Sequence, residues 1–211
     1  GIRDPEMSRG LEMCIRDRTW FVPHDVDGLV ELMGGRDAFI GKLDSLFTAD
    51  SKLEGESTSV DISGLIGQYA HGNEPSHHIA HLYNYVGQPW RTQEIVDEVL
   101  HTLYFNNPDG LSGNEDCGQM SAWYILNAMG FYQVCPGKPV YSIGRPLFNE
   151  ATVHLKDGKS FKVIAHNNSR DNKYVQSIVL NGHKLETPFF THQDIVDGGT
   201  LELTMGSEPL K

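Results

Sequence analysis

The chain has 211 residues, of which 39% are hydrophobic and 21% are charged, a composition that is ordinary for a globular protein and argues against disorder. Its formal net charge is −11 and no run of Lys and Arg occurs, which argues against a nucleic-acid partner because phosphate binding needs clustered cations. No stretch is apolar for the ~18 residues that a membrane span requires, so we predict no such span.

Residues 1–18 differ from the rest of the chain. They mix arginines with acidic residues and show neither helical nor strand periodicity. They also lack the apolar core and small-residue cleavage site of a signal peptide. We interpret this segment as foreign or artefactual, and we expect Leu11, Met13 and Ile15 to lie outside the protein core.

Residues 19–135 are expected to be mainly helical, because their apolar residues recur at helical spacing. Gly-rich residues 63–67 are expected to form a connecting loop and the start of a helix, and Asn107–Gly110 a turn. The expected helices run from Asp25 to about Phe47 with a break at Gly34-Gly35, from Pro75 to Gly87, from an N-cap at Thr92, and from Gly118 to Met129.

Residues 136–211 are expected to form an antiparallel β unit, because the apolar period changes to two. Lys156–Lys159 and Asn181-Gly182 are typical hairpin turns. The alternating residues Leu201, Leu203 and Met205 predict a last strand. The fold class is therefore α+β, with helices first and strands afterwards.

Polar residues gather in three loops, each of which opens a predicted helix: Pro23–Gly28, His71–His78 and Gly110–Gln119. Carboxylates, amides and aromatic rings together suit carbohydrate chemistry, because sugars offer many hydroxyls and apolar ring faces. Each loop also has a plain structural explanation, since Asp and Asn commonly cap helices. The residues alone therefore leave an acidic hydrolase site and simple capping both open.

Two further patterns are weaker. His77 and His81 have the i, i+4 spacing of a shared zinc ion, but no general base stands between them and no third ligand is identifiable. We interpret both as hydrogen-bonded packing residues. The three cysteines, Cys14, Cys117 and Cys135, do not form a disulfide framework, and the sequence leaves a single bridge between Cys117 and Cys135 open.

Three strings resemble the signature blocks of glycoside hydrolase family 92, the calcium-dependent exo-α-mannosidases. They are WFVPHDVDGL at residues 20–29, YAHGNEPSHH at 69–78 and GNEDCGQMSAWY at 113–124. The tail, with Asn167–Ser169, Leu180–Gly182 and Met205-Gly206, is similar to the C-terminal β region of that family. The resemblance covers about residues 20–211. It implies that residues 19–135 are the C-terminal part of an (α/α)6 barrel, preceded in the parent enzyme by a β-sandwich.

The resemblance also implies roles for individual residues. Asp116 matches the general base, with Asn114 and Glu115 as neighbours that tune or orient it. Asn73 and Glu74 match the region that binds Ca2+. Hard oxygen ligands of this kind suit calcium. We expect substrate contacts from His24, Asp25, Asp27, His71 and Gln119.

The general acid is where the sequence departs from the family. Glu12 stands at the matching offset, but residues 13–18 match nothing in the acid-bearing block. We therefore interpret Glu12 as a coincidence. Loss of a general acid costs about 10²–10⁴-fold in rate, so the chain by itself is expected to be impaired.

The implied function is inverting, calcium-assisted hydrolysis of terminal α-mannosidic linkages in mannose-containing glycans, as in bacterial N-glycan degradation. The alternative is a non-catalytic glycan-binding or structural remnant. A third interpretation, another (α/α)6 enzyme such as a phosphorylase or lyase, is weaker, since a phosphorylase needs a basic phosphate pocket. Resemblance further implies a periplasmic or extracellular parent protein.

Overall fold

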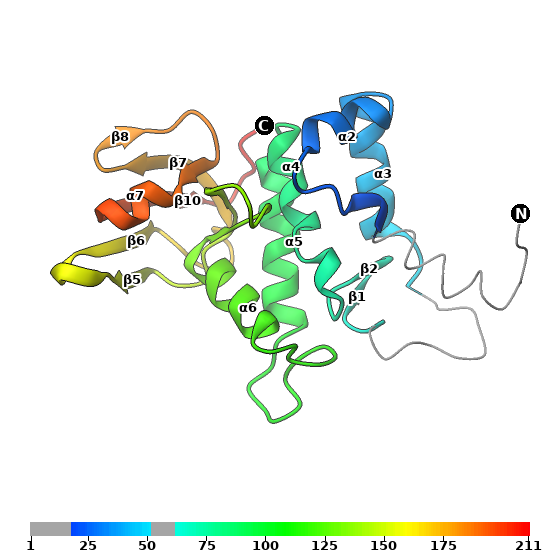
Figure 1. Cartoon of the computed structure of the whole chain (residues 1–211), viewed down its shortest axis with the longest axis horizontal. Coiled ribbons are helices and arrows are strands. Elements are labelled where there is room, and N and C mark those ends of the chain that lie inside the picture. The colour runs from blue at the N-terminus through cyan, green and yellow to red at the C-terminus, as the bar shows by residue number, and fades with distance from the viewer. Residues whose placement is uncertain (1–17, 52–61) are drawn as a thin grey trace, which may run out of the picture. The chain divides into compact units, whose positions relative to one another are not determined.

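The computed structural model describes residues 18–51 and 62–211 (Figure 1). Its internal contacts form two compact units, each discontinuous in sequence. The first comprises the described residues up to Ile79 together with Leu103–Met120, and the second comprises Ala80–Thr102 and Ser121–Lys211. The predicted boundary between the helical and β regions at residue 135 stays a prediction. Leu11, Met13 and Ile15 lie outside the described residues.

The first unit begins with two helices, α2 (Val26–Leu32) and α3 (Arg36–Thr48). Asp25 caps α2, because its carboxylate accepts a hydrogen bond of 3.0 Å from the backbone N–H of Gly28. Gly34 and Gly35 separate the helices with φ angles of 97° and 95°, a backbone conformation that favours glycine. The predicted helix with a break at these glycines is confirmed.

The region after residue 61 differs from the prediction. The prediction of a connecting loop and helix start at residues 63–67 was wrong, because β1 (Leu65–Ile66) and β2 (Tyr69–Ala70) form a short hairpin around Gly67. The helix predicted from Pro75 is divided into η1 (Glu74–Ser76), η2 (Ile79–His81) and α4 (Leu82–Tyr85). The apolar residues that recur at helical spacing here, which include Leu82 and Tyr83, are nonetheless buried. Burial pattern was therefore easier to predict than helix continuity.

The second unit contains α5 (Pro89–Thr102) and most of α6 (Gln119–Met129). The prediction of Thr92 as an N-cap was wrong: α5 begins at Pro89 and Thr92 is buried within it. Pro89 suits the first turn, where a backbone N–H has no helical partner. The prediction for α6 is confirmed within a residue, and Gly130 with φ 102° ends it.

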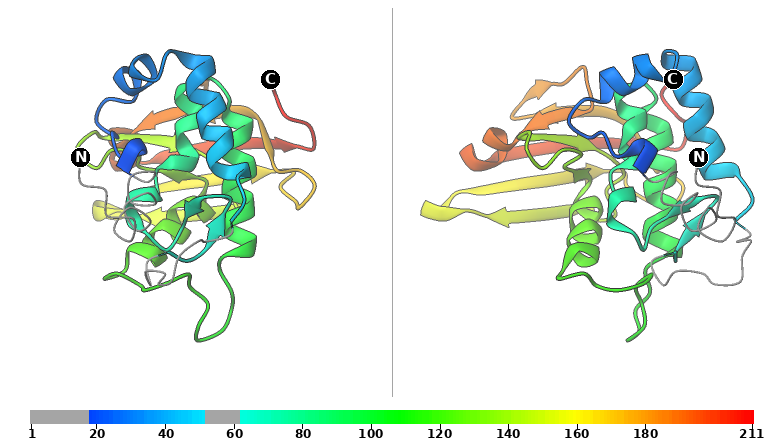
Figure 2. Two further views of the ribbon diagram at one scale, coloured as in Figure 1. Left: turned by 90° about the vertical axis from the view of Figure 1, so that its right-hand side faces the viewer. Right: turned by 45° about the vertical axis from the view of Figure 1, so that its right-hand side comes forward.

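Two sheets complete the second unit. The larger has the strand order β5-β6-β10-β7-β8, and the smaller has the order β3-β4-β9. Figure 2 shows β10 lying between β6 and β7. The strands are β3 (Phe131–Tyr132), β4 (Val140–Ile143), β5 (Glu150–His154), β6 (Ser160–His166), β7 (Tyr174–Leu180), β8 (His183–Lys184), β9 (Phe189–Thr191) and β10 (Gly199–Gly206).

The prediction of a purely antiparallel β unit needs one correction. Both predicted hairpins, β5–β6 and β7–β8, are antiparallel, but β10 pairs with β6 in parallel. A parallel pair requires a crossover connection, and the chain between the two strands includes a helix that the sequence analysis missed, α7 (His192–Asp197). Thr191 and Asp194 form a capping box at its start.

The core of the second unit follows the alternation predicted for the last strand. Leu201, Leu203 and Met205 of β10 are all buried, and they pack in a cluster that includes Phe161 and Phe190. The rings of Phe161 and Phe190 are stacked with their centroids 5.8 Å apart. Within the part of the chain that the structure describes, no helix has the length and apolar character of a membrane span.

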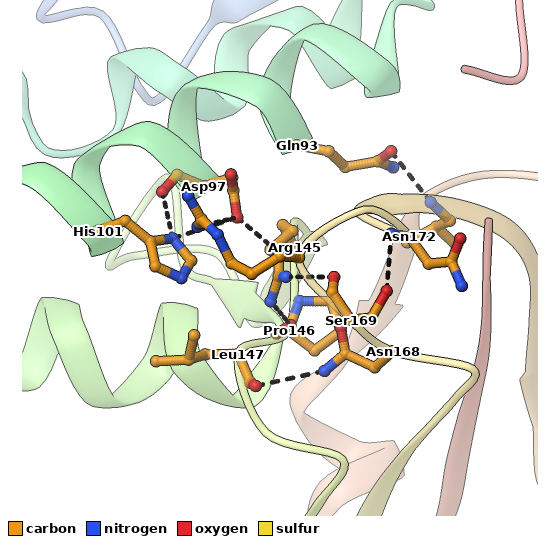
Figure 3. Close-up of polar contacts among 11 residues, drawn as sticks. Gln93, Asp97, His101, Arg145, Pro146, Leu147, Asn168, Ser169 and Asn172 are labelled. Atoms are coloured by element: carbon orange, nitrogen blue, oxygen red, sulfur yellow. Dashed lines mark hydrogen bonds and ion pairs between the residues drawn. The ribbon is translucent and has the colours of Figure 1, made fainter. Parts of the chain in front are cut away.

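A buried ion pair joins α5 to the segments that flank the sheets of the second unit (Figure 3). The Arg145 Nε lies 2.8 Å from the Asp97 Oδ1, an ion pair that lacks hydrogen-bond geometry at Nε. The Arg145 guanidinium also donates to the carbonyl oxygens of Pro146 and Ser169, the latter at 2.9 Å. His101 lies 3.2 Å from the same Asp97 oxygen. Only 2% of the Arg145 surface is exposed, so its charge depends on these partners.

We therefore expect Asp97→Ala to destabilise the chain strongly. Removing one partner of a buried pair leaves an uncompensated charge, which costs about 3–5 kcal/mol. The matched control is Glu150→Ala, which breaks a solvent-exposed pair with Lys162 and should cost less than about 1 kcal/mol. Urea unfolding followed by circular dichroism measures both, and equal losses would show that Asp97 and Arg145 contribute no more than a surface pair.

Candidate active site

Two of the three predicted polar loops approach each other closely in the first unit. The backbone N–H groups of His71 and Gly72 donate to the carbonyls of Gly64 and Ser63, each at 3.0 Å. A Cβ atom on Gly72 would lie 2.1 Å from the Ser63 Oγ, and one on Gly113 would lie 3.5 Å from the Gly72 carbonyl oxygen. The segments therefore contact through backbone. Asn73 and Asn114, which directly follow these glycines, begin the two predicted site blocks.

The predicted general base lies in an unusual turn. Asp116, Cys117 and Gly118 have φ angles of 51°, 57° and 97° in succession. Left-handed conformations cost non-glycine residues on the order of 1 kcal/mol or more each, so surrounding contacts must hold them. The Asp116 side chain is exposed, as a base that reaches water must be. The N–H of Gln119 donates to the Asp116 carbonyl at 3.2 Å and so closes the turn.

His77 connects this turn to the other loop. Its Nε2 lies 2.9 Å from the His71 carbonyl oxygen, and its Nδ1 lies 3.0 Å from the Gln119 side-chain nitrogen. Burial lowers the pKa of His77 to about 4, while its hydrogen bond to the His71 carbonyl and the nearby Asp116 charge act in the opposite direction. The ring is therefore neutral at physiological pH.

His71 is fully buried in the same network. Its Nδ1 lies 2.8 Å from the Tyr69 hydroxyl and its Nε2 lies 2.7 Å from the Tyr104 hydroxyl. Tyr104 in turn donates to the Met120 carbonyl at 3.1 Å. Burial also lowers the pKa of His71. A substrate contact at His71 stays a prediction, and both of its ring nitrogens are engaged with tyrosines in this structure.

The two residues predicted to bind calcium stand at the start of η1. Asn73 is half-buried and Glu74 is exposed, and the Glu74 carboxylate has no ion-pair partner among the described residues. Both side chains offer the hard oxygen ligands that Ca2+ prefers. No group of three or more His, Cys, Asp or Glu side chains with metal-binding geometry occurs in residues 18–51 and 62–211. The pair thus fits calcium in its chemistry and supplies part of a coordination sphere, which requires about six to eight oxygens.

The third predicted loop lies in the first unit beside α2. His24, Asp25 and Asp27 are all exposed there. The Asp25 carboxylate has a structural role as the helix cap. Substrate contacts from these residues stay predictions.

His81, which the sequence analysis interprets as a hydrogen-bonded packing residue, lies in the second unit. Both ring nitrogens of His81 are hydrogen-bonded, Nδ1 to the Ser142 hydroxyl at 3.1 Å and Nε2 to the Asn127 side-chain oxygen at 2.9 Å. A ring with both nitrogens engaged has no lone pair to offer a metal ion. Cys117 and Cys135 are free thiols.

Solved structures similar to this chain indicate its class of protein. The chain superposes on part of the family GH92 α-mannosidase BT3965 of Bacteroides thetaiotaomicron with a TM-score of 0.83 and 42% identity over 92% of its length. It also superposes on the family GH92 inverting mannosidase BT2199 of the same organism, with a TM-score of 0.78 and 44% identity over 90% of its length. The fold is thus part of a glycoside hydrolase fold.

The family follows from the sequence match. Residues 4–207 match the glycosyl hydrolase family 92 catalytic domain, so the chain belongs to glycosyl hydrolase family 92. It is also 32% identical over 200 residues to an uncharacterized secreted glycosidase of Arthroderma benhamiae. The chain spans 24% of that protein and 25% of BT3965, about a quarter of each. The interpretation of residues 1–18 as foreign stays a prediction, and the family match includes most of that segment.

The sequence analysis did not predict the hydrogen-bonded network of His and Tyr side chains next to the candidate site. The buried side chains of Tyr69, His71 and His77 and the partly buried Tyr104 form a polar network, and the sequence analysis gave only His71 a role in the site. The available signal was the density of His and Tyr around a glycine in residues 69–78, because polar rings buried beside a site need mutual partners.

The close approach of the loops predicts that Gly72→Ala is destabilising. The new Cβ would meet Ser63 and the Ser112 carbonyl, and overpacking of this kind costs about 1–3 kcal/mol. The double variant Ser63→Ala with Gly72→Ala removes the nearest atom and should recover part of the loss. Gly137→Ala is the control, since its Cβ would meet nothing within 4 Å. Equal unfolding midpoints for Gly72→Ala and Gly137→Ala would contradict the contact.

Proposed function

We propose that the enzyme to which this chain belongs hydrolyses terminal α-mannosidic linkages in mannose-containing glycans with inversion at the anomeric carbon. The observation that carries the proposal is the backbone approach at Gly72 and Gly113, which holds the Asn73–Glu74 and Asn114–Asp116 blocks together. Membership of family 92, with relatives named as α-mannosidases and one as an inverting mannosidase, supports the substrate and the stereochemistry.

In this proposal Asp116 is the general base. Its exposed carboxylate removes a proton from a water molecule as the water oxygen bonds to the anomeric carbon. The glycosidic bond breaks at the same time, and a general acid protonates the leaving oxygen. Inverting glycosidases separate the two carboxyl groups by roughly 6.5–9.5 Å to admit the water. Asn114 and Glu115 precede the base on the same loop and orient it.

Asn73 and Glu74 would hold the calcium ion through an amide and a carboxylate oxygen. When bound, calcium supplies a hard Lewis acid for vicinal sugar hydroxyls. The rest of the coordination sphere comes from water, sugar and other parts of the enzyme. Glu74 is available for this role, because its carboxylate is exposed and makes no ion pair with the described residues.

The helical segment is proposed to complete an (α/α)6 barrel in the parent enzyme, with a β-sandwich before it. The superposition on a quarter of a solved mannosidase supports this arrangement. An exported location is also proposed, because one relative is described as a secreted glycosidase. The general acid stays unassigned in this proposal, because residues 13–18 do not match the acid-bearing block that the resemblance implies, and Glu12 lies outside the described residues.

The competing proposal is a non-catalytic glycan-binding or structural remnant. The observation that favours it is the lack of a match between residues 13–18 and the acid-bearing block that the resemblance implies. A base without its acid would bind sugar and turn it over slowly. Activity of the complete parent gene product on α-mannobiosides, with and without chelator, distinguishes the two proposals.

We expect Asp116→Asn in the complete enzyme to reduce turnover by about 10²–10⁴-fold, because the amide keeps the shape of the base but cannot accept a proton. Mannoside binding should change little. Glu74→Gln should instead weaken calcium binding, so that activity recovers in part at high calcium. Steady-state kinetics across a calcium titration measure both effects.

Asp109→Asn is the control for both variants, because Asp109 is an exposed carboxylate in the same unit and lies in the Asn107–Gly110 turn. It should leave the kinetics and the calcium dependence unchanged. Rescue of Asp116→Asn by calcium, or indifference of Glu74→Gln to calcium, would mean that the two roles are assigned wrongly.

A further inference from the structure

The hydrogen bonds of His77 define which of its ring nitrogens carries the proton. A carbonyl oxygen can only accept, so the Nε2 that faces the His71 carbonyl must carry the hydrogen. The Gln119 side-chain nitrogen can only donate, so the Nδ1 that it faces at 3.0 Å is the acceptor of its N–H. His77 therefore holds Gln119 in one orientation, with the amide nitrogen toward the ring.

Gln119 is the residue that closes the turn of the general base. Its N–H donates to the Asp116 carbonyl at 3.2 Å, and the next N–H, of Met120, donates to the Glu115 carbonyl at 3.3 Å. Asp116 and Cys117 both have left-handed backbones, which persist only when the surroundings hold them. The link from Gln119 to the buried His77 is a contact that can supply this constraint.

His77 is itself fixed from the other loop. Its backbone N–H donates to the Glu74 carbonyl at 3.0 Å, and its ring packs against the ring of His71 with the centroids 4.9 Å apart. Only 1% of its surface is exposed. Because it is buried and its ring nitrogens already face the chain, His77 is placed to act through its neighbours and not through direct contact with a sugar.

We propose that His77 is a positioning residue that orients Asp116, by holding Gln119 and thereby tying the base turn to the Asn73–Glu74 loop. The expected effect of His77 on catalysis rests on the proposed function, since it takes Asp116 as the general base. The expected effect of His77 on the turn at residues 115–120 does not depend on the proposed function, because the geometry of this turn can be measured without any substrate.

Two substitutions at His77 separate the two hydrogen bonds. His77→Asn places an amide oxygen near the position of Nδ1 and so keeps an acceptor for Gln119. His77→Gln reaches the position of Nε2 and keeps a donor for the His71 carbonyl, but it loses the acceptor for Gln119. The proposal requires that Gln disturbs the turn and that Asn largely preserves it.

The first measurement is hydrogen exchange on the 211-residue chain. We expect the N–H groups of Gln119 and Met120 to exchange at least about ten-fold faster in His77→Gln than in His77→Asn, because loss of the anchor opens the turn. His78→Gln is the control: its buried ring bonds to the Trp20 carbonyl at 2.8 Å, away from the turn, and these amides should stay protected. Equal exchange in the two His77 variants overturns the proposal.

The second measurement is kinetic and uses the complete enzyme. His77→Gln should lower kcat by about 10–100-fold with little change in KM, since small misplacement of a catalytic group has effects of that size. His77→Asn should restore most of the rate. Equal kcat values for the two variants, or a loss confined to KM, overturn the positioning role. An unsubstituted enzyme without mannosidase activity would instead refute the proposed function and leave the exchange result as the test.

Discussion

The contact between backbone segments at Ser63, Gly72 and Gly113 is the constraint on which the candidate site depends. Side chains at the two glycines would separate the segments, because a Cβ on Gly72 alone would fall 2.1 Å from the Ser63 Oγ. Backbone contact brings the loop that carries Glu74 next to the loop that carries Asp116. Hydrogen bonds as short as those of His77 and Gln119 are possible only once the two loops are this close.

The two compact units are stabilised in different ways. In the second unit Asp97 and Arg145 form a buried ion pair, which fixes geometry at a high desolvation cost. In the first unit the network of His71, His77 and their tyrosine partners is kept neutral by burial. Such a neutral network adds no fixed positive charge beside the turn that contains Asp116.

The parts of the fold that could be predicted from sequence depend on local signals. The break at Gly34-Gly35, the end of α6 at Gly130 and the hairpin at Asn181-Gly182 each follow from residues within one turn of the feature. The parallel pairing of β10 with β6 could not be predicted this way, because it depends on a long connection and on packing of both strands. Thr92 was misassigned for a related reason: tertiary burial placed a good capping residue inside a helix.

The candidate site shows the same division between local and long-range information. The glycines and acidic residues of the two blocks can be identified in the sequence, and Gly113 and Gly118 have positive φ angles that favour glycine. The partners of His77 could not be predicted, since Gln119 lies 42 residues further along the chain. Such pairs are specified only when the fold brings the loops together.

The hydrogen bond between His77 and Gln119 matters because the backbone at Asp116 and Cys117 is left-handed and strained. Two adjacent non-glycine residues in this conformation store strain of the order of a few kcal/mol. Glycine at either position would relieve it, but the proposed role of Asp116 as a general base requires its carboxylate. The strain must therefore be offset elsewhere, and Gln119 is adjacent to the turn and bonded to the buried His77. The orientation of the proposed base therefore depends on residues that need no contact with the substrate.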